Sequence, residues 1–172
     1  MTDWTQFPPA LPLEQIFQIK NPSKLEHELG NHCFMKKRRF SQSLTSAEEM
    51  FQGLARMGDE IAGDGFICLF HEVYGPEYFA KICDALTEAG GIKLRDLLRE
   101  AWAIYTKGKE PITVDELRAI SVRRFNNREL MDRFDAIGEE VMKDIQEQHA
   151  SGKVWSVEYA KLHRNEFEPI KQ

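Results

Sequence analysis

Apolar residues recur at helical spacing in three consecutive segments between residues 59 and 105. Glycines separate these segments, at Gly63 and Gly65, at Gly75 and at Gly90. The apolar positions are Phe66, Leu69, Phe70, Val73 and Tyr74, then Phe79, Ile82, Cys83, Leu86 and Ala89, then Leu94, Leu97, Leu98, Ala101, Trp102 and Tyr105. Side chains spaced three and four residues apart share one face of a helix, and that face must be buried against another element. We therefore predict three core helices in this stretch.

A capped helix and a basic run are predicted before this core. Asn21 followed by Pro22 is typical of a helix start, because asparagine caps the first turn and proline is tolerated there. We predict that this helix ends at Gly30, and that a short helix over residues 13–19 precedes it. The run KKRR at residues 36–39 is interpreted as a solvated connector whose charges pair with acidic groups of the same chain or of a second subunit. A phosphate contact is the alternative.

Two capping boxes predict two further helix starts. The patterns Thr-Ser-Ala-Glu at residues 45–48 and Thr-Val-Asp-Glu at residues 113–116 each place a threonine three residues before a glutamate. In a capping box, each of these side chains binds the backbone N–H of the other residue. We predict that the first of these helices ends near Gly63 and that the second runs to about residue 125.

The longest predicted helix spans residues 128–150. Its buried stripe is predicted to contain Leu130, Phe134, Ile137, Val141 and Ile145. At 100° per residue, the opposite face contains Glu129, Asp132, Asp135, Glu139, Glu140 and Glu147. The sequence therefore predicts a helix with one apolar face and one acidic face.

The C-terminal segment is predicted to form a last helix, with Trp155, Tyr159 and Leu162 at helical spacing. A strand over residues 154–157 is the competing interpretation. No alternating pattern elsewhere is long enough to build a sheet. We predict an all-α protein with a single compact multi-helix domain of roughly seven or eight helices. Its parts are a proline-containing N-terminal arm with the basic run (1–44), the helical domain (45–167) and a tail (168–172).

The distribution of charge narrows the classes of partner. The net charge is −5, and the excess of acidic residues lies within residues 46–150. Such a surface repels phosphates, so we expect no direct binding of nucleic acid. Three cysteines are too few for a disulfide framework, and no apolar run is long enough to span a membrane. We expect a cytoplasmic protein without a membrane contact.

Candidate catalytic and metal-binding motifs are incomplete. His27, His32 and Cys33 lie close in sequence, but no second Cys/His pair completes a zinc site. Cys68 and Cys83 fall in apolar stripes, where a thiol packs as a small hydrophobic group. We expect no metal, no cofactor and no enzymatic activity. An enzyme whose pocket assembles only in three dimensions is the least favoured alternative.

The core stretch resembles a bacterial family that is typified by a DNA-mimic protein of the nineteen-kilodalton type. The resemblance covers residues 45–167, whereas residues 1–44 do not share it. The matching pieces are Asp59-Glu60-Ile61, Gly63-Asp64-Gly65-Phe66, Leu69-Phe70, Gly75, Ala85-Leu86, Gly90-Gly91 and Leu97-Leu98. These are packing motifs, so they support the fold more directly than the function.

The resemblance implies an all-helical protein, often a dimer, whose carboxylates imitate DNA phosphates and occupy a basic DNA-binding protein such as a transcription factor. The acidic face of residues 128–150 is the candidate site. Its extension would comprise Asp59, Glu60, Asp64, Glu72, Glu77, Asp84 and Glu88.

Two observations support alternatives to mimicry. Arg123, Arg124, Arg128 and Arg133 lie near the acidic face and are spaced to pair with it, for example Arg128 with Asp132 and Glu129 with Arg133. The second interpretation keeps the fold and changes the binding surface. In it, the chain is an immunity- or adaptor-type binder that uses aromatic and apolar patches around Trp4, Trp155 or Tyr159.

Overall fold

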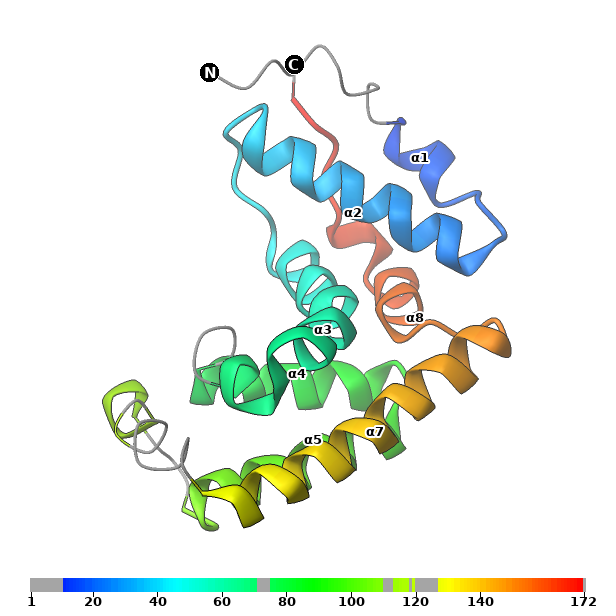
Figure 1. Cartoon of the computed structure of the whole chain (residues 1–172). Coiled ribbons are helices and arrows are strands. Elements are labelled where there is room, and N and C mark those ends of the chain that lie inside the picture. The colour runs from blue at the N-terminus through cyan, green and yellow to red at the C-terminus, as the bar shows by residue number, and fades with distance from the viewer. Residues whose placement is uncertain (1–10, 71–74, 110–112, 118, 120–126, 172) are drawn as a thin grey trace.

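The structure, a computed structural model, describes residues 11–70, 75–109, 113–117, 119 and 127–171. Its elements in chain order are α1 (Leu13–Ile16), α2 (Pro22–Arg38), α3 (Ser46–Cys68), α4 (Pro76–Glu88), α5 (Ile92–Thr106), α7 (Arg128–Ala150), α8 (Trp155–Leu162) and the 3-10 helix η3 (Arg164–Glu166). Residues 114–117 are also helical. None of the described residues forms a strand, and the predicted all-α class is confirmed (Figure 1).

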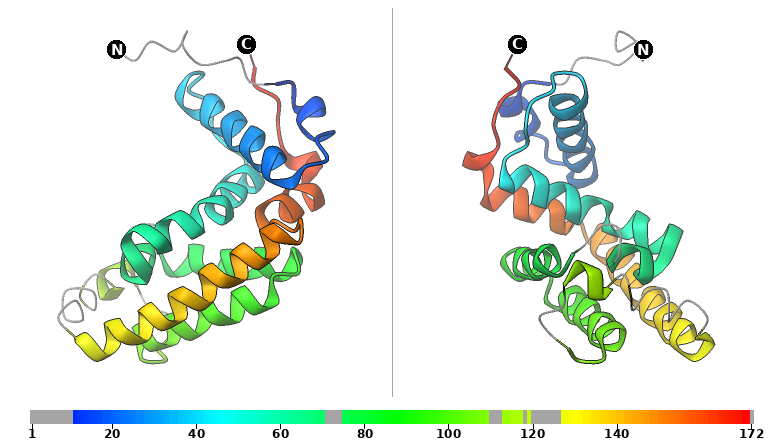
Figure 2. Two further views of the ribbon diagram at one scale, coloured as in Figure 1. Left: turned by 45° about the vertical axis from the view of Figure 1, so that its right-hand side comes forward. Right: turned by 90° about the vertical axis from the view of Figure 1, so that its left-hand side faces the viewer.

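The long helix α3 links two groups of helices. On one side of it lie α1, α2 and the C-terminal segment, and on the other lie α4, α5 and α7 (Figures 1 and 2). Helix α8 packs beside α3 and also contacts α2 and α4. Helix α7 packs on both α3 and α5, so one of its faces is covered and the other faces outward (Figure 2).

An aromatic cluster forms the centre of the second group. The ring of Phe79 stacks on that of Trp102 with centroids 4.4 Å apart, and Phe70 meets Trp102 edge-on at 5.1 Å. Phe66 and Tyr105 reach Phe134 of α7 at 5.9 and 6.2 Å. Such pairs stabilise a core beyond the effect of the buried area alone. The aromatic residues are therefore packing groups, as the helical spacing predicts.

One predicted helix end is wrong. Helix α2 continues through Gly30 to Arg38, because its buried face extends from Leu25 and Leu29 to Met35. Burial of that face outweighs the cost of about 1 kcal/mol for one glycine inside a helix. The break predicted near Gly63 is found at Gly65, where φ is 72° and a side chain would be strained, and helical residues resume beyond it to Cys68.

Most of the other predicted helices and caps are confirmed. Helix α7 has the predicted bounds, and the capping boxes at Thr45 and Thr113 both form. The short N-terminal helix ends at Ile16 rather than at residue 19. The last helix forms and the alternative strand does not, although Leu162 points outward and is 63 % exposed. The predicted helix end near residue 125 lies outside the described residues.

The basic run is the last turn of α2 rather than a solvated connector. Lys36 is 2 % exposed, and its Nζ lies 2.8 Å from Oε2 of Glu48, which is fully buried. Lys37, Arg38 and Arg39 are exposed. The expected pairing within the chain is therefore confirmed for Lys36, while its predicted exposure is wrong.

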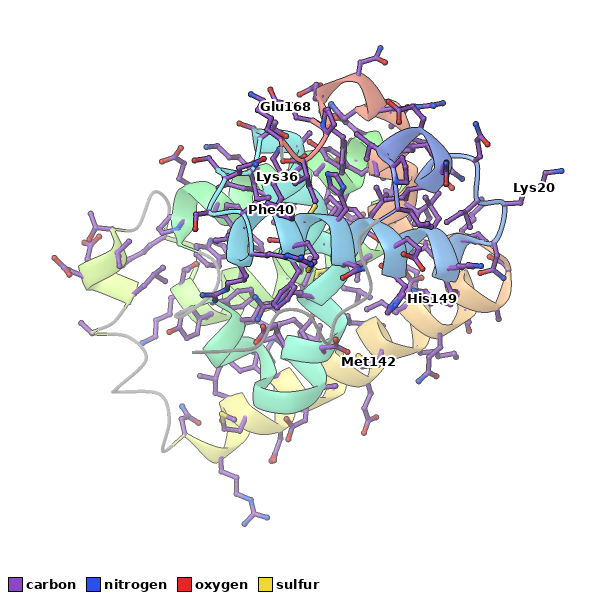
Figure 3. All side chains as sticks on the ribbon, turned by 90° about the horizontal axis from the view of Figure 1, so that it is seen from above. Lys20, Lys36, Phe40, Met142, His149 and Glu168 are labelled. Carbon is purple, nitrogen blue, oxygen red and sulfur yellow. The ribbon has the colours of Figure 1, made fainter. Side chains whose placement is uncertain are left out.

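Glu48 also fixes the C-terminal segment. Its Oε2 accepts a hydrogen bond from Thr45 N at 2.8 Å, and its Oε1 accepts one from Glu168 N at 3.1 Å. The Glu168 carbonyl lies 3.0 Å from His32 Nε2. Figure 3 shows Lys36 and Glu168 beside each other above the end of α2. This buried polar cluster joins α2, α3 and the tail.

Candidate protein-interaction surface

Helix α7 carries the predicted acidic face. Its start is fixed by Asn127, whose side chain accepts a hydrogen bond from Leu130 N. Its inner face buries Leu130, Phe134, Ile137 and Val141, as predicted, with Ile145 partly buried. The six predicted carboxylates, those of Glu129, Asp132, Asp135, Glu139, Glu140 and Glu147, are all exposed.

Two neighbouring helices hold α7 in place. Lys93, at the start of α5, is near Asp144, whereas Tyr105, at the end of α5, is near Phe134. The two helices are therefore antiparallel. Helix α3 runs in the same sense as α5, because Phe66 also meets Phe134, and Gly58 lies against Ile145. A helix packed along two others presents its outer face with little freedom to rearrange.

Asp144 is an acidic residue of α7 that does not belong to the acidic face. It is 2 % exposed, and its Oδ1 lies 3.3 Å from Nζ of Lys93. Its Oδ2 has no hydrogen-bond partner among the described residues. Sequence reasoning assigned Asp144 to neither face. The available signal was its position three residues after the buried Val141, on the same side of the helix.

Most of the acidic face is free of ion pairs. Glu147 lies 3.9 Å from Lys143, but within the described ranges no cation comes within 4.0 Å of the other five carboxylates. The anticipated pairs of Arg128 with Asp132 and of Glu129 with Arg133 are thus not formed. Arg123 and Arg124 lie outside the described residues. Five of the six carboxylates are therefore unpaired among the described residues.

The predicted extension of this face is smaller than expected. Glu60, Glu77 and Glu88 are engaged by Arg56, Lys81 and His163, respectively. Asp59 and Asp84 are exposed and have no ion pair with any described residue. Of these two, Asp59 lies on α3, which packs against α7, whereas Asp84 lies on α4. The side chains of Asp64 and Glu72 are outside the described part of the chain.

The spacing of the carboxylates can be compared with that of DNA phosphates. An α-helix rises about 1.5 Å per residue, so the six carboxylates cover about 27 Å of axis at one charge per roughly 5 Å. Each strand of duplex DNA carries one charge per about 3.4 Å of axis. The face is therefore comparable to one strand of DNA, at a somewhat lower charge density.

A comparison with protein families identifies the chain. The family model described as DMP19-like protein matches residues 42–161, which is more than half of the sequence. The chain belongs to the DMP19-like family. This is a family of DNA mimic proteins. Comparisons with curated proteins and with solved structures give no match.

The matched region of this DMP19-like chain runs from just before the Thr45 cap to the end of α8. It therefore includes α7 and both helices that support it. It excludes α1 and α2, as well as η3 and the C-terminal segment. The family assignment thus applies to the part of the fold that carries the acidic face.

Cysteine and histidine provide no competing centre in the described ranges of this DMP19-like chain. No group of three His, Cys, Asp or Glu residues there could hold a metal ion. Burial raises the pKa of the Cys33 thiol to about 12 and also raises the pKa of Cys83, so neither is a reactive thiolate. No helix in the described ranges is long and apolar enough to cross a membrane.

We expect the stability of the protein to depend on pH through His163. Its Nδ1 is 2.7 Å from Glu166 and its Nε2 is 2.8 Å from Glu88, and these hydrogen bonds raise its pKa, with Glu166 the larger cause. Because the pKa of His163 is higher in the folded chain than in the unfolded chain, where it is near 6.5, protonation of His163 stabilises the fold at pH values below 6.5. This stabilisation is lost as the pH rises through the pKa of the folded chain. We expect His163→Gln to lower the melting temperature by about 1–3 °C at pH 6. By pH 9 this difference should disappear.

Thermal unfolding of both proteins at pH 6, 7, 8 and 9 measures this effect. Glu166→Gln serves as the companion variant, because it removes the larger cause and should reduce the same dependence. A difference between wild type and His163→Gln that stays constant with pH would show that His163 acts through packing alone.

Proposed function

We propose that this chain binds a basic DNA-binding protein through the outer face of α7 and thereby keeps that protein from DNA. Membership in a family of DNA mimic proteins supports this function. The family is non-enzymatic, and the proposal therefore concerns binding alone. The partner would carry Lys and Arg side chains arranged for a phosphate backbone, because those groups would meet the carboxylates of α7.

The observation that carries the proposal is the exposure, on one helix packed against two others, of five carboxylates that have no ion pair with any described residue. A carboxylate that is already paired within the chain would have to exchange its own cation for one of the partner, and this exchange adds little to the free energy of binding. Free carboxylates on a fixed support form their first ion pairs with the partner, and they lose little conformational freedom of the backbone. Electrostatic attraction of this kind also accelerates association with a basic protein.

The described residues do not form the exposed aromatic patch that the adaptor alternative requires around Trp155 and Tyr159. Tyr159 is only 8 % exposed, and Trp155 packs partly buried against Gly91. Trp4 lies outside the described residues. Binding through a large apolar patch would need other residues than the ones that sequence reasoning favoured.

Affinity capture from host lysate tests the proposed function. The immobilised full chain is expected to retain a basic DNA-binding protein, and added duplex DNA should release it because both compete for one surface. Several hundred millimolar salt should release it too, since exposed charges are screened. A captured protein that is released by neither DNA nor salt would contradict mimicry. Sedimentation of the free and bound chain would test at the same time whether it forms the homodimer that the family resemblance implies.

A further inference from the structure

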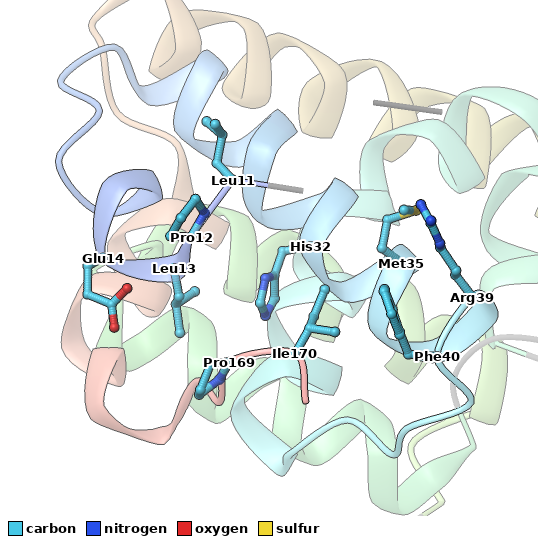
Figure 4. Close-up of a pocket in the computed structure, with 10 residues that line it drawn as sticks. All are labelled: Leu11, Pro12, Leu13, Glu14, His32, Met35, Arg39, Phe40, Pro169 and Ile170. Carbon is cyan, nitrogen blue, oxygen red and sulfur yellow. The ribbon is translucent and has the colours of Figure 1, made fainter. Parts of the chain in front are cut away.

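A cavity of about 610 Å³ lies at the opposite end of the molecule from the aromatic core. It is open to solvent on one side and is lined by α1, the second half of α2 and the C-terminal segment that follows Glu168 (Figure 4). Leu13, Met35, Phe40 and Ile170 provide apolar walls. Small-molecule sites have volumes of about 300–1,000 Å³ and are mostly apolar with a few polar groups. The cavity therefore has the size of a ligand site, and polar and apolar groups share its lining about equally.

One cation stands at an end of this cavity. Arg39 is exposed, and its guanidinium lies over the ring of Phe40 at 5.4 Å from the centroid. No carboxylate of the described chain lies within 4.0 Å of it. Glu14 lies at the other end of the cavity (Figure 4). The cavity therefore has an uncompensated positive end and a negative end, joined by apolar walls.

The remaining polar lining group is neutral. His32 is 2 % exposed, and burial is the main cause that lowers its pKa. Its neutral ring donates from Nε2 to the carbonyl of Glu168 at 3.0 Å, so this tautomer leaves Nδ1 as an acceptor without a partner among the described residues. Arg39 is thus the single cation among the described lining residues, and they include no Ser, Cys, Lys or Tyr nucleophile. These groups suit binding rather than catalysis.

We propose that this cavity binds a small monocarboxylate with a single apolar chain as its body. Its carboxylate pairs with Arg39, and its apolar body lies along Leu13, Met35 and Ile170. Each methylene group removed from water contributes about 0.8 kcal/mol, so the apolar body provides most of the affinity. The carboxylate fixes the orientation, and Glu14 disfavours a second anionic group at the far end. The inference is independent of the acidic face of α7.

Two probes with one apolar body and different heads test the proposal. Decanoate and decan-1-ol are titrated into the full chain below their aggregation concentrations, and backbone amide shifts are followed by NMR. Decanoate is expected to bind about threefold to fivefold more tightly than decan-1-ol, as an exposed ion pair provides. The shifts should be confined to α1, the end of α2 and residues 168–171. Equal affinities, or shifts centred elsewhere, would overturn the proposal.

Three variants locate the charge effect. Arg39→Gln should abolish the preference for decanoate while leaving decan-1-ol affinity unchanged. Glu14→Gln should strengthen decanoate binding by about twofold, because it removes a like charge. Lys37→Gln is the matched control, since Lys37 is an exposed cation on the same turn but does not line the cavity. If Lys37→Gln and Arg39→Gln weaken decanoate binding equally, the charge effect is nonspecific and the assignment is wrong.

Discussion

Replacing Glu48 by alanine is expected to lower the free energy of unfolding by about 3–5 kcal/mol. Glu48 is fully buried and balances the charge of Lys36, which is itself 2 % exposed. Its carboxylate also accepts hydrogen bonds from Thr45 N and Glu168 N. Alanine would leave the buried ammonium group with only the exposed carboxylate of Glu168, at 3.8 Å, as its counter-charge, and it would remove one of the hydrogen bonds that hold the C-terminal segment. Loss of a buried counter-charge is among the most destabilising single changes in a protein.

Urea unfolding of three variants measures this effect. Glu49→Ala is the matched control, because it removes an exposed glutamate from the same first turn and should cost less than about 1 kcal/mol. The double variant Lys36→Met with Glu48→Gln removes both charges but keeps an acceptor for the cap. It should be clearly more stable than Glu48→Ala, since no buried charge is left alone. A Glu48→Ala variant no less stable than Glu49→Ala would disprove the role of the cluster.

Reversing four charges on α7 is expected to weaken partner binding by about a hundredfold or more. The variant changes Asp132, Asp135, Glu139 and Glu140 to lysine. These residues are exposed and have no ion pair with any described residue, so the reversal should leave the fold intact. Like charges would then face each other across the interface, and each such contact opposes binding. The dissociation constant for the captured protein measures the effect.

A second variant with the same net charge distinguishes the effect of the charges on α7 from the effect of the total charge of the protein. It reverses Glu14, Glu28, Glu49 and Glu158, which lie on α1, α2, α3 and α8. We expect its affinity to stay within about tenfold of wild type, because long-range attraction changes but the interface does not. Circular dichroism confirms that both variants are folded. Equal losses in the two variants would mean that only overall charge matters and would remove α7 as the site.

The family resemblance found in the sequence agrees with the family match, and the all-α fold could be predicted because helical signals are local. The bounds of α7 follow from Asn127 at its start, the apolar stripe and the glycine after Ser151. The prediction failed where local signals conflicted. At Gly30 a local helix breaker was overruled by burial of the residues on both sides. Such an override depends on contacts with α1, α3 and α8, which no local pattern contains.

The exposure of the six carboxylates on α7 was predictable, since it depends only on which residues lie opposite the apolar stripe. That five of them have no ion pair with any described residue was not predictable, because arginines at pairing distance in sequence were present. The same limit applies to the cavity at Arg39, whose walls come from both ends of the chain. Whether the carboxylates of α7 are the binding site remains the prediction that charge reversal tests.

The sequence by itself determined where helices form, which faces are apolar and where acidic residues gather, because these properties repeat within a few residues along the chain. Only the tertiary structure decided which charges are buried. Lys36 and Lys37 are adjacent and chemically equal, yet one is buried and the other exposed. The partners of Glu48 are 12 residues away at Lys36 and 120 residues away at Glu168. A buried charge needs such partners in space, and only folding brings them together.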